Sequence, residues 1–376
     1  MPESTELLDR LRRWPDVEAP ELQAFDATDA YLLDDTDPAG YGPGEIVVIG
    51  DRYGALTLGL LAAGATGVRT HQDGVSGELA LAANATSTGL SGYASLPLGE
   101  ELLAGARLVL LQLPRGLDAL DEVAGAVARW AHPSVQLVAG GRVKHMSLAQ
   151  NAVLARHFEQ VAAGLARQKS RLLRASGPRP AASLWPQRAR IAELDLEVLA
   201  HGAAFGGTAL DPGSRLLLNH LDRLPAAGVA VDLGCGTGLL AATLARRAPG
   251  LRVVATDQSA AAVDSARATL LANGIDAEVV RADAMSAFAD ASVDLVLLNP
   301  PFHIGATVHA GIARKLMADA ARALRPGGAL WTVWNSHLQY APDLRRIVGP
   351  TEQVARDRRF TVSRSVRALP ASGSAR

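Results

Sequence analysis

The sequence has a single cysteine, few aromatic residues and no long apolar run. Cys235 stands alone among 376 residues, which excludes an intramolecular disulfide and a cysteine-based zinc cluster, and we expect no metal site. Aromatic residues make up 4%, so the cores have to be built from alanine, leucine and valine. The first residues are charged, and no run of about 18 apolar residues exists to span a membrane. We therefore expect a cytoplasmic monomer without membrane association.

Two parts of the chain repeat one layout. Each begins with an apolar run that ends in a glycine turn, continues into a helix, and then has a strand ending in an acid. A shift of 184 residues aligns Gly50 with Gly234, Gly54 with Gly238, and Asp73 with Asp257. Strands that alternate with helices of about 10–15 residues indicate βαβ units and a mostly parallel sheet. The pattern predicts an α/β fold of two tandem Rossmann-like domains that arose by duplication.

Prolines and glycines mark a boundary near the middle of the chain. We predict a first domain at 1–177, a proline-rich basic linker at 178–195 and a second domain at 196–376. Residues 351–357 and 360–369 read as a two-stranded hairpin that closes the second sheet.

The second copy carries a glycine loop and acids at successive strand ends. Glycines at a strand-to-helix turn let the backbone approach a ligand, and the following helix adds a positive field. NAD would also fit such a loop, and a glycine-rich turn with incidental acids is the simplest alternative. An acid two residues before the first glycine suits a cationic amino-acid group better than a pyrophosphate, so we favour S-adenosyl-L-methionine. The predicted cofactor residues are Asp232, Gly234, Gly236, Gly238, Asp257 and Asp283.

A tetrad of Asn299, Pro300, Pro301 and Phe302 follows the apolar run VDLVLL. The prolines stiffen the loop and remove two N–H donors. The Asn299 side-chain oxygen and the Pro300 carbonyl can then accept both hydrogens of an exocyclic amine, which localises the nitrogen lone pair. Phe302 can stack on a planar base that has left its helix. This arrangement predicts methylation of a planar amine or amide nitrogen.

These motifs together resemble class I S-adenosylmethionine-dependent methyltransferases. The fuller set, NPPFH at 299–303 with 209–221 and 334–349, is similar to the bacterial ribosomal RNA guanine-N2 methyltransferases of the RsmC/RlmG type. The segments 21–33, 51–56 and 139–146 resemble the large-subunit (23S) branch more than the small-subunit (16S) branch. The resemblance implies N2-methylation of one guanosine in ribosomal RNA, free or in a ribosomal subunit, by a catalytic second domain beside a degenerate first domain.

The resemblance also implies roles for single residues. It places Asn299 and Pro300 on the target amine, Phe302 against the base, and His303 in the signature, where it either packs the loop or contacts the base. Arg215 and Phe205 either cover the site or serve packing and an ion pair.

The first copy has lost the motif residues. Val48 stands where the second copy has its first acid, Arg52 replaces the middle glycine, and the tetrad becomes Gln112-Leu-Pro-Arg115. We expect no methyl transfer there, and the domain serves either RNA binding or only folding.

Charge is distributed unevenly. Residues 1–51 hold 13 acids and 3 arginines, whereas 156–190 hold 8 basic residues and one acid. The basic stretch could bind phosphates or be a solvated face, and its candidates for RNA contact are Lys169, Arg171 and Arg174. Arg356, Arg358 and Arg359 at the hairpin tip are weaker candidates that could simply face water.

Three other functions remain open. The tetrad also suits methylation of adenine N6 or of protein glutamine, since both present a planar NH₂ group. A non-catalytic RNA-binding or ribosome assembly factor would keep the fold without the chemistry. A nicotinamide dehydrogenase lacks support because no acid–base set for hydride transfer is visible.

Overall fold

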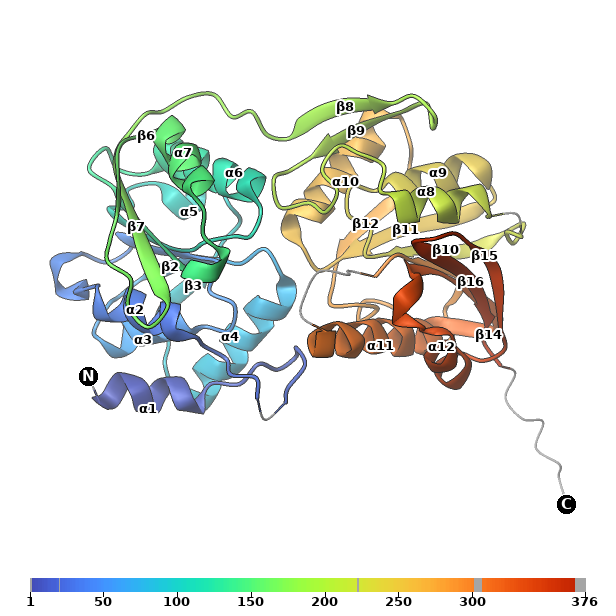
Figure 1. Cartoon of the computed structure of the whole chain (residues 1–376), viewed down its shortest axis with the longest axis horizontal. Coiled ribbons are helices and arrows are strands. Elements are labelled where there is room, and N and C mark those ends of the chain that lie inside the picture. Colours follow the sequence, from blue (N-terminus) through green and yellow to red (C-terminus); the bar gives the residue numbers. More distant parts are fainter. Residues whose placement is uncertain (1, 20, 222, 301–305, 369–376) are drawn as a thin grey trace, which may run out of the picture. The chain divides into compact units, whose positions relative to one another are not determined.

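The chain divides into two compact α/β units, 1–186 and 187–376, each built on a seven-stranded sheet (Figure 1). The computed structural model describes residues 2–19, 21–221, 223–300 and 306–368. In these ranges no helix combines the length and the apolar character that crossing a bilayer requires.

The two sheets share one topology. The strand order is β3-β2-β1-β4-β5-β7-β6 in the first and β12-β11-β10-β13-β14-β16-β15 in the second. In each sheet the strands pair in parallel except for β7 and β16, which are antiparallel to both of their neighbours. This equivalence confirms the two tandem Rossmann-like domains predicted from the repeat. The strands of the first sheet are β1 (Ile46–Ile49), β2 (Val68–His71), β3 (Tyr93–Ser95), β4 (Leu108–Gln112), β5 (Gln136–Arg142), β6 (Phe158–Ala163) and β7 (Ser170–Pro178). Those of the second are β10 (Gly228–Leu233), β11 (Leu251–Asp257), β12 (Glu278–Arg281), β13 (Val293–Leu298), β14 (Leu324–Asn335), β15 (Thr351–Arg356) and β16 (Phe360–Val366).

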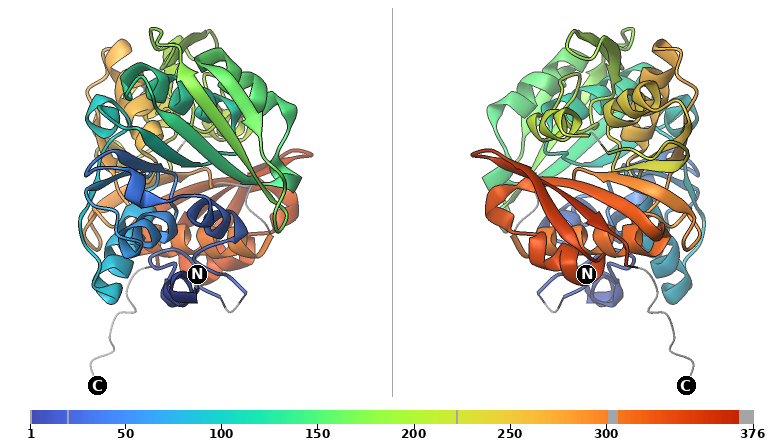
Figure 2. Two further views of the ribbon diagram at one scale, coloured as in Figure 1. Left: turned by 90° about the vertical axis from the view of Figure 1, so that its left-hand side faces the viewer. Right: turned by 90° about the vertical axis from the view of Figure 1, so that its right-hand side faces the viewer.

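Helices cover both faces of each sheet, and so the central strands are apolar runs without alternation (Figure 2). The first unit contains α1 (Pro2–Arg10), α2 (Ala27–Asp34), α3 (Ala55–Ala62), α4 (Val75–Thr88), α5 (Glu100–Leu103), α6 (Leu117–Trp130) and α7 (Leu148–His157). The second contains α8 (Pro212–Asn219), α9 (Leu239–Arg247), α10 (Ala260–Ala272), α11 (Ala306–Ala323) and α12 (Ala341–Ile347).

The same glycine turn leads into the first helix after the central strand of each unit. Gly54 and Gly238 are the N-caps of α3 and α9, with φ of 94° and 76°. A Cβ at Gly238 would lie 3.0 Å from Ala266, so the close packing of α9 on α10 also requires glycine. The glycines at equivalent sequence positions therefore form the same left-handed turn in both units.

A polar stripe on α10 holds the strand that precedes the second sheet. This strand, β9 (Leu196–Ala200), pairs with β8 (Gln187–Ile191). On its other side Asn273 bonds both the N–H and the carbonyl of Glu197, at 3.0 and 2.7 Å. Thr269 bonds both groups of Leu199. In the first unit Asn84 likewise bonds both backbone groups of one residue in the N-terminal segment.

The division between the two units falls within the predicted linker, although part of that linker is a strand. The division between units falls after Pro186, and the expected linker, 178–195, contains strand β8. Most of the basic stretch lies before this linker, in the β6–β7 hairpin of the first sheet, which residues 158–163 and 170–178 form.

Replacing Asn273 with alanine should destabilise the second unit. The change leaves the Glu197 N–H and carbonyl without their side-chain partner, at an expected cost of about 1–3 kcal/mol. Differential scanning calorimetry would measure it, with Leu271→Ala, a change at an 82% exposed side chain of the same helix, as the control. If the two variants melt at the same temperature, the stripe does not hold the strand.

Candidate functional site

The glycine loop of the second unit leaves its backbone accessible. Gly234 and Gly236 both have positive φ, 75° and 53°. A Cβ on Gly234 would meet no described atom within 4 Å, and one on Gly236 would meet the Phe205 carbonyl oxygen at 3.8 Å. The loop also orients Asp257, because the Gly236 N–H donates to one of its carboxylate oxygens at 3.0 Å while Ser259 donates to the other. These two bonds hold the Asp257 carboxylate in one orientation at the end of β11.

Asp232, one of the predicted cofactor residues, is turned inward. Its side chain is fully buried, and Oδ2 accepts the Ala241 N–H at 2.9 Å at the start of α9. Oδ1 is also buried and has no partner among the described residues. Burial raises the pKa of Asp232 to about 7, and the nearby charge of Asp257 adds to the rise. Asp232 therefore supports the glycine loop from beneath.

Asp283 lies two residues beyond β12 and forms an ion pair. Lys315 on α11 donates to its Oδ2 at 2.6 Å. Lys315 escaped sequence reasoning, because only the fold brings α11 next to this strand end. A ligand amino group at Asp283 would share the carboxylate with this lysine.

The Asn299 side chain is held by hydrogen bonds from its amide nitrogen, whereas its amide oxygen has no partner among the described residues. The amide nitrogen donates to Asp211 Oδ2 at 2.7 Å and to Ser214 Oγ at 3.0 Å. The amide oxygen is buried and has no hydrogen-bond partner in the described part of the chain. A buried acceptor without a donor is costly unless a ligand supplies one. The arrangement therefore presents one oriented acceptor beside the buried Pro300.

Asp211 and Ser214 are site residues that sequence reasoning missed. Asp211 is the N-cap of α8, and its carboxylate also accepts the Ser214 N–H. The local signal was visible, because an Asp-Pro-Gly-Ser sequence is typical of a capped helix start. Their contact with Asn299 spans 88 and 85 residues of sequence, so only the tertiary structure reveals it.

Of the remaining candidate residues in the second unit, the structure describes Arg215 and Phe205. Arg215 makes a bidentate ion pair with Glu193, in line with the ion-pair alternative. Phe205 stays 54% exposed beside the glycine loop. Phe302 and His303 lie outside the described residues.

The first unit keeps part of this arrangement. The Gln112 side-chain amide donates to Asp29, the third helical residue of α2, as the Asn299 amide donates to Ser214, the third of α8. Burial raises the pKa of Asp29 to about 7. Because Arg52 stands in the place of Gly236, the loop lacks the residue that opens the backbone in the second unit.

The basic stretch is largely ion-paired. Arg174 contacts Asp35 at 2.5 Å and Arg167 contacts Asp34 at 2.8 Å, so the acidic N-terminal segment neutralises part of it. Lys169 is exposed in a turn. Arg171 has its Nε buried without a partner among the described residues.

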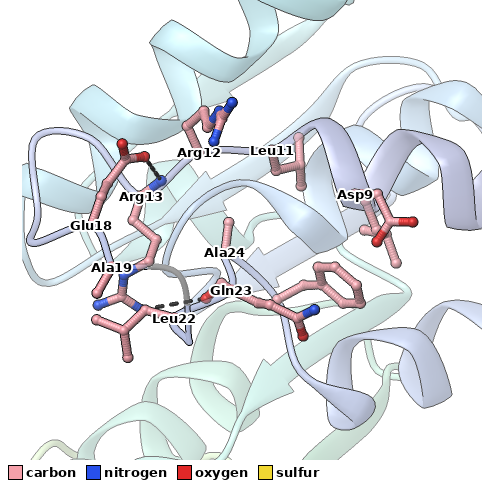
Figure 3. Close-up of a pocket in the computed structure, with 11 residues that line it drawn as sticks. Asp9, Leu11, Arg12, Arg13, Glu18, Ala19, Leu22, Gln23 and Ala24 are labelled. Carbon is pink, nitrogen blue, oxygen red and sulfur yellow. Dashed lines mark hydrogen bonds between the residues drawn. The ribbon is translucent and has the colours of Figure 1, made fainter.

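A pocket of about 480 Å³ in the first unit lies apart from all these residues (Figure 3). It is lined by α1 and the segment that follows. Arg13 crosses it, bonding the Glu18 carboxylate through its backbone N–H and the Gln23 carbonyl through its guanidinium. These contacts within one segment hold the segment together and mark no ligand site.

Comparisons with known proteins agree on the family. The profile described as "RLMG N-terminal domain" matches residues 3–179, and "Methyltransferase small domain" matches 195–364. A Streptomyces avermitilis protein named "Ribosomal RNA large subunit methyltransferase G" is 35% identical and covers 95% of this chain and 96% of its own length. One of the same name from Pseudomonas paraeruginosa is 37% identical, covering 94% and 96%.

A solved structure shares the whole fold. It is the T. thermophilus 16S rRNA N2 G1207 methyltransferase (RsmC) in complex with AdoMet and guanosine, with a TM-score of 0.76 and 24% identity over 96% of this chain and 99% of that one. The structural likeness shows the two-unit fold, and the relatives show the family. The chain belongs to the ribosomal RNA large subunit methyltransferase G family.

Proposed function

We propose that the protein transfers a methyl group from S-adenosylmethionine to the exocyclic N2 amine of a guanosine in 23S ribosomal RNA. The observation that carries the proposal is the buried oxygen of Asn299, which accepts no hydrogen bond from any residue that the structure describes. The protein's family supports large-subunit RNA as the substrate, because its members are named as methyltransferases of the large-subunit ribosomal RNA.

The residues of the second unit fit the cofactor. The open backbone at Gly234 and Gly236 can accept its amino-acid end, and the fixed carboxylate of Asp257 can accept both ribose hydroxyls. Asp283 would accept the adenine amino group while paired with Lys315. When bound, S-adenosylmethionine supplies an electrophilic methyl group.

Asn299 and Pro300 would act on the target amine. The Asn299 oxygen and the Pro300 carbonyl accept its two N–H bonds, which moves the lone pair out of conjugation with the ring. Asp211 and Ser214 fix the Asn299 amide, so its oxygen does not need to reorganise when the amine arrives. The amine becomes acidic only as it is methylated, so no strong base is required. Phe302 is the proposed stacking partner of the base.

A methyl-acceptor assay tests the function. The purified protein is incubated with labelled S-adenosylmethionine and unmodified 23S or 16S RNA, free or in subunits, and the RNA is digested to nucleosides. We expect label in N2-methylguanosine from 23S RNA. Asn299→Ala should lower turnover by about 100-fold or more, as the loss of an oriented acceptor does, while cofactor affinity stays within about twofold.

Other outcomes would overturn parts of the proposal. Label in N6-methyladenosine would keep the chemistry and change the base. Cofactor binding without label in any RNA would redirect the search to protein glutamine. Full activity of Asn299→Ala would refute the role of its oxygen.

Asp211→Asn tests the anchor of Asn299. The variant keeps an acceptor oxygen for the Ser214 N–H but loses the charge that strengthens the bond to the Asn299 amide. We expect kcat to fall about tenfold with little change in melting temperature or cofactor affinity. Asp29→Asn, which changes the carboxylate that holds the Gln112 amide in the first unit, is the control and should leave kcat unchanged. Equal effects of the two variants would show a general structural role.

Cofactor affinity should rise between pH 6 and pH 8. Burial disfavours the charged form and raises the pKa of Asp232 from 3.8 to about 7, so in the free protein the carboxyl is neutral below pH 7 and ionises as the pH rises through 7. A positively charged cofactor above the carboxylate favours its ionised form, so binding releases a proton. Calorimetry in two buffers of different ionisation enthalpy would count that proton. Asp232→Asn should remove the pH dependence, and Asp29→Asn should retain it; pH-independent binding by the wild type would contradict the linkage.

A further inference from the structure

Three exposed arginines, the last residue of β15 and two in the turn that follows it, have no ion pair with any residue that the structure describes. Arg356, Arg358 and Arg359 make no contact within 4.0 Å with an acidic group and no side-chain hydrogen bond among the residues that the structure describes. Most other arginines of the second unit are paired, for example Arg215 with Glu193, Arg252 with Glu278, and Arg325 with Asp294. Uncompensated positive charge is thus concentrated at one turn.

The turn is held in one conformation. The Asp357 carboxylate accepts the backbone N–H groups of Arg359 and Phe360, at 2.7 and 2.6 Å. The Arg359 carbonyl accepts the Ser336 N–H at 2.8 Å. With Asp357 ionised, three arginines leave the turn a net charge of about +2. Since the backbone is already ordered, a ligand would not have to order it on binding.

Contacts connect this turn to Asn299. Phe360, which ends the turn, packs under the first turn of α8, where a Cβ on Gly213 would lie 3.4 Å from its ring. The cap of that helix turn is Asp211, which holds the Asn299 amide at 2.7 Å.

Strand pairing also places the turn near Asn299. β14 pairs with both β13 and β16, at Leu298–Thr332 and Asn335–Phe360, so the arginine turn and Asn299 lie at one edge of the second sheet, where the hairpin is drawn in red (Figure 2).

We propose that the β15–β16 turn binds the RNA backbone phosphates next to the target guanosine. The guanidinium groups are suited to phosphate oxygens, which they can contact through paired N–H donors. A base that is extruded into the site loses its stacking, and contacts to the flanking phosphates help to hold the strand in place. The proposal rests on the function proposed above, because it assumes that the site at Asn299 takes an RNA base.

Charge-neutralising variants test the turn against a matched control. Arg358→Gln with Arg359→Gln removes two charges, and Arg246→Gln with Arg252→Gln removes the same number from exposed positions at the amino ends of the strands. RNA affinity is measured by filter binding from 50 to 300 mM salt, using a 23S fragment that the wild type binds. Kinetics, cofactor affinity and melting temperature are measured alongside.

We expect the turn variant to lower the slope of log K against log salt by about 1 to 2, the loss of one or two phosphate contacts. Its KM for RNA should rise, while kcat at saturating RNA and cofactor affinity stay unchanged. Arg358→Lys with Arg359→Lys should restore the slope, because the charge is retained. The control pair should leave the slope at the wild-type value.

Several results would overturn the proposal. An unchanged slope and KM in the glutamine variant would leave the turn as a solvated face, and an equal fall in the control pair would show a general effect of net charge. A turn variant that binds RNA normally but no longer binds an acidic peptide would assign the surface to a protein. Because binding is measured apart from methylation, RNA binding without methyl transfer would refute the proposed function alone, and the slopes would still decide on the turn.

Discussion

A buried carboxylate at the start of a helix is the interaction on which both units depend. In the second unit Asp232 accepts the Ala241 N–H, and in the first Asp51 accepts the Thr57 N–H, at the position 184 residues earlier. The acids themselves are not aligned, since Asp51 lies three residues after Val48, the counterpart of Asp232. The first unit has therefore lost the strand acid but supports the same helix N-terminus from another position. Burial of a charge is costly, so keeping a carboxylate there indicates that the turn needs an acceptor.

The two units differ in whether the glycine turn leaves its backbone accessible. Both keep a side-chain amide bonded to the third residue of a capped helix, Gln112 in one and Asn299 in the other. In the second unit Gly236 leaves its backbone open, and no residue that the structure describes bonds the Asn299 oxygen. The first unit has Arg52 in place of that glycine. The two units thus share one framework, and a few substitutions, such as Arg52 for the glycine, distinguish the first unit from the candidate site in the second.

The two units also differ in how their basic residues are paired. The acidic N-terminal segment of the first unit pairs with its basic stretch, through Asp34 and Asp35, so much of the apparent charge asymmetry is internal. The arginines that have no ion pair among the described residues lie instead next to the turn before β16, two strands away from β13, whose end precedes Asn299. A count of charges along the chain could not separate these two cases, because ion pairing depends on residues more than 130 positions apart, as for Arg174 and Asp35.

The sequence by itself determined the repeat, the βαβ order, the glycine loop and the Asn-Pro-Pro-Phe tetrad, because these are local patterns of apolar spacing, turn chemistry and motif. It also determined the β15–β16 hairpin. Only the tertiary structure decided that Asp232 faces inward, that Lys315 neutralises Asp283 and that Asp211 with Ser214 holds Asn299. Each of these depends on which distant elements pack together, and hydrogen bonds between elements far apart in sequence form only once the sheet and its helices have brought those elements into contact.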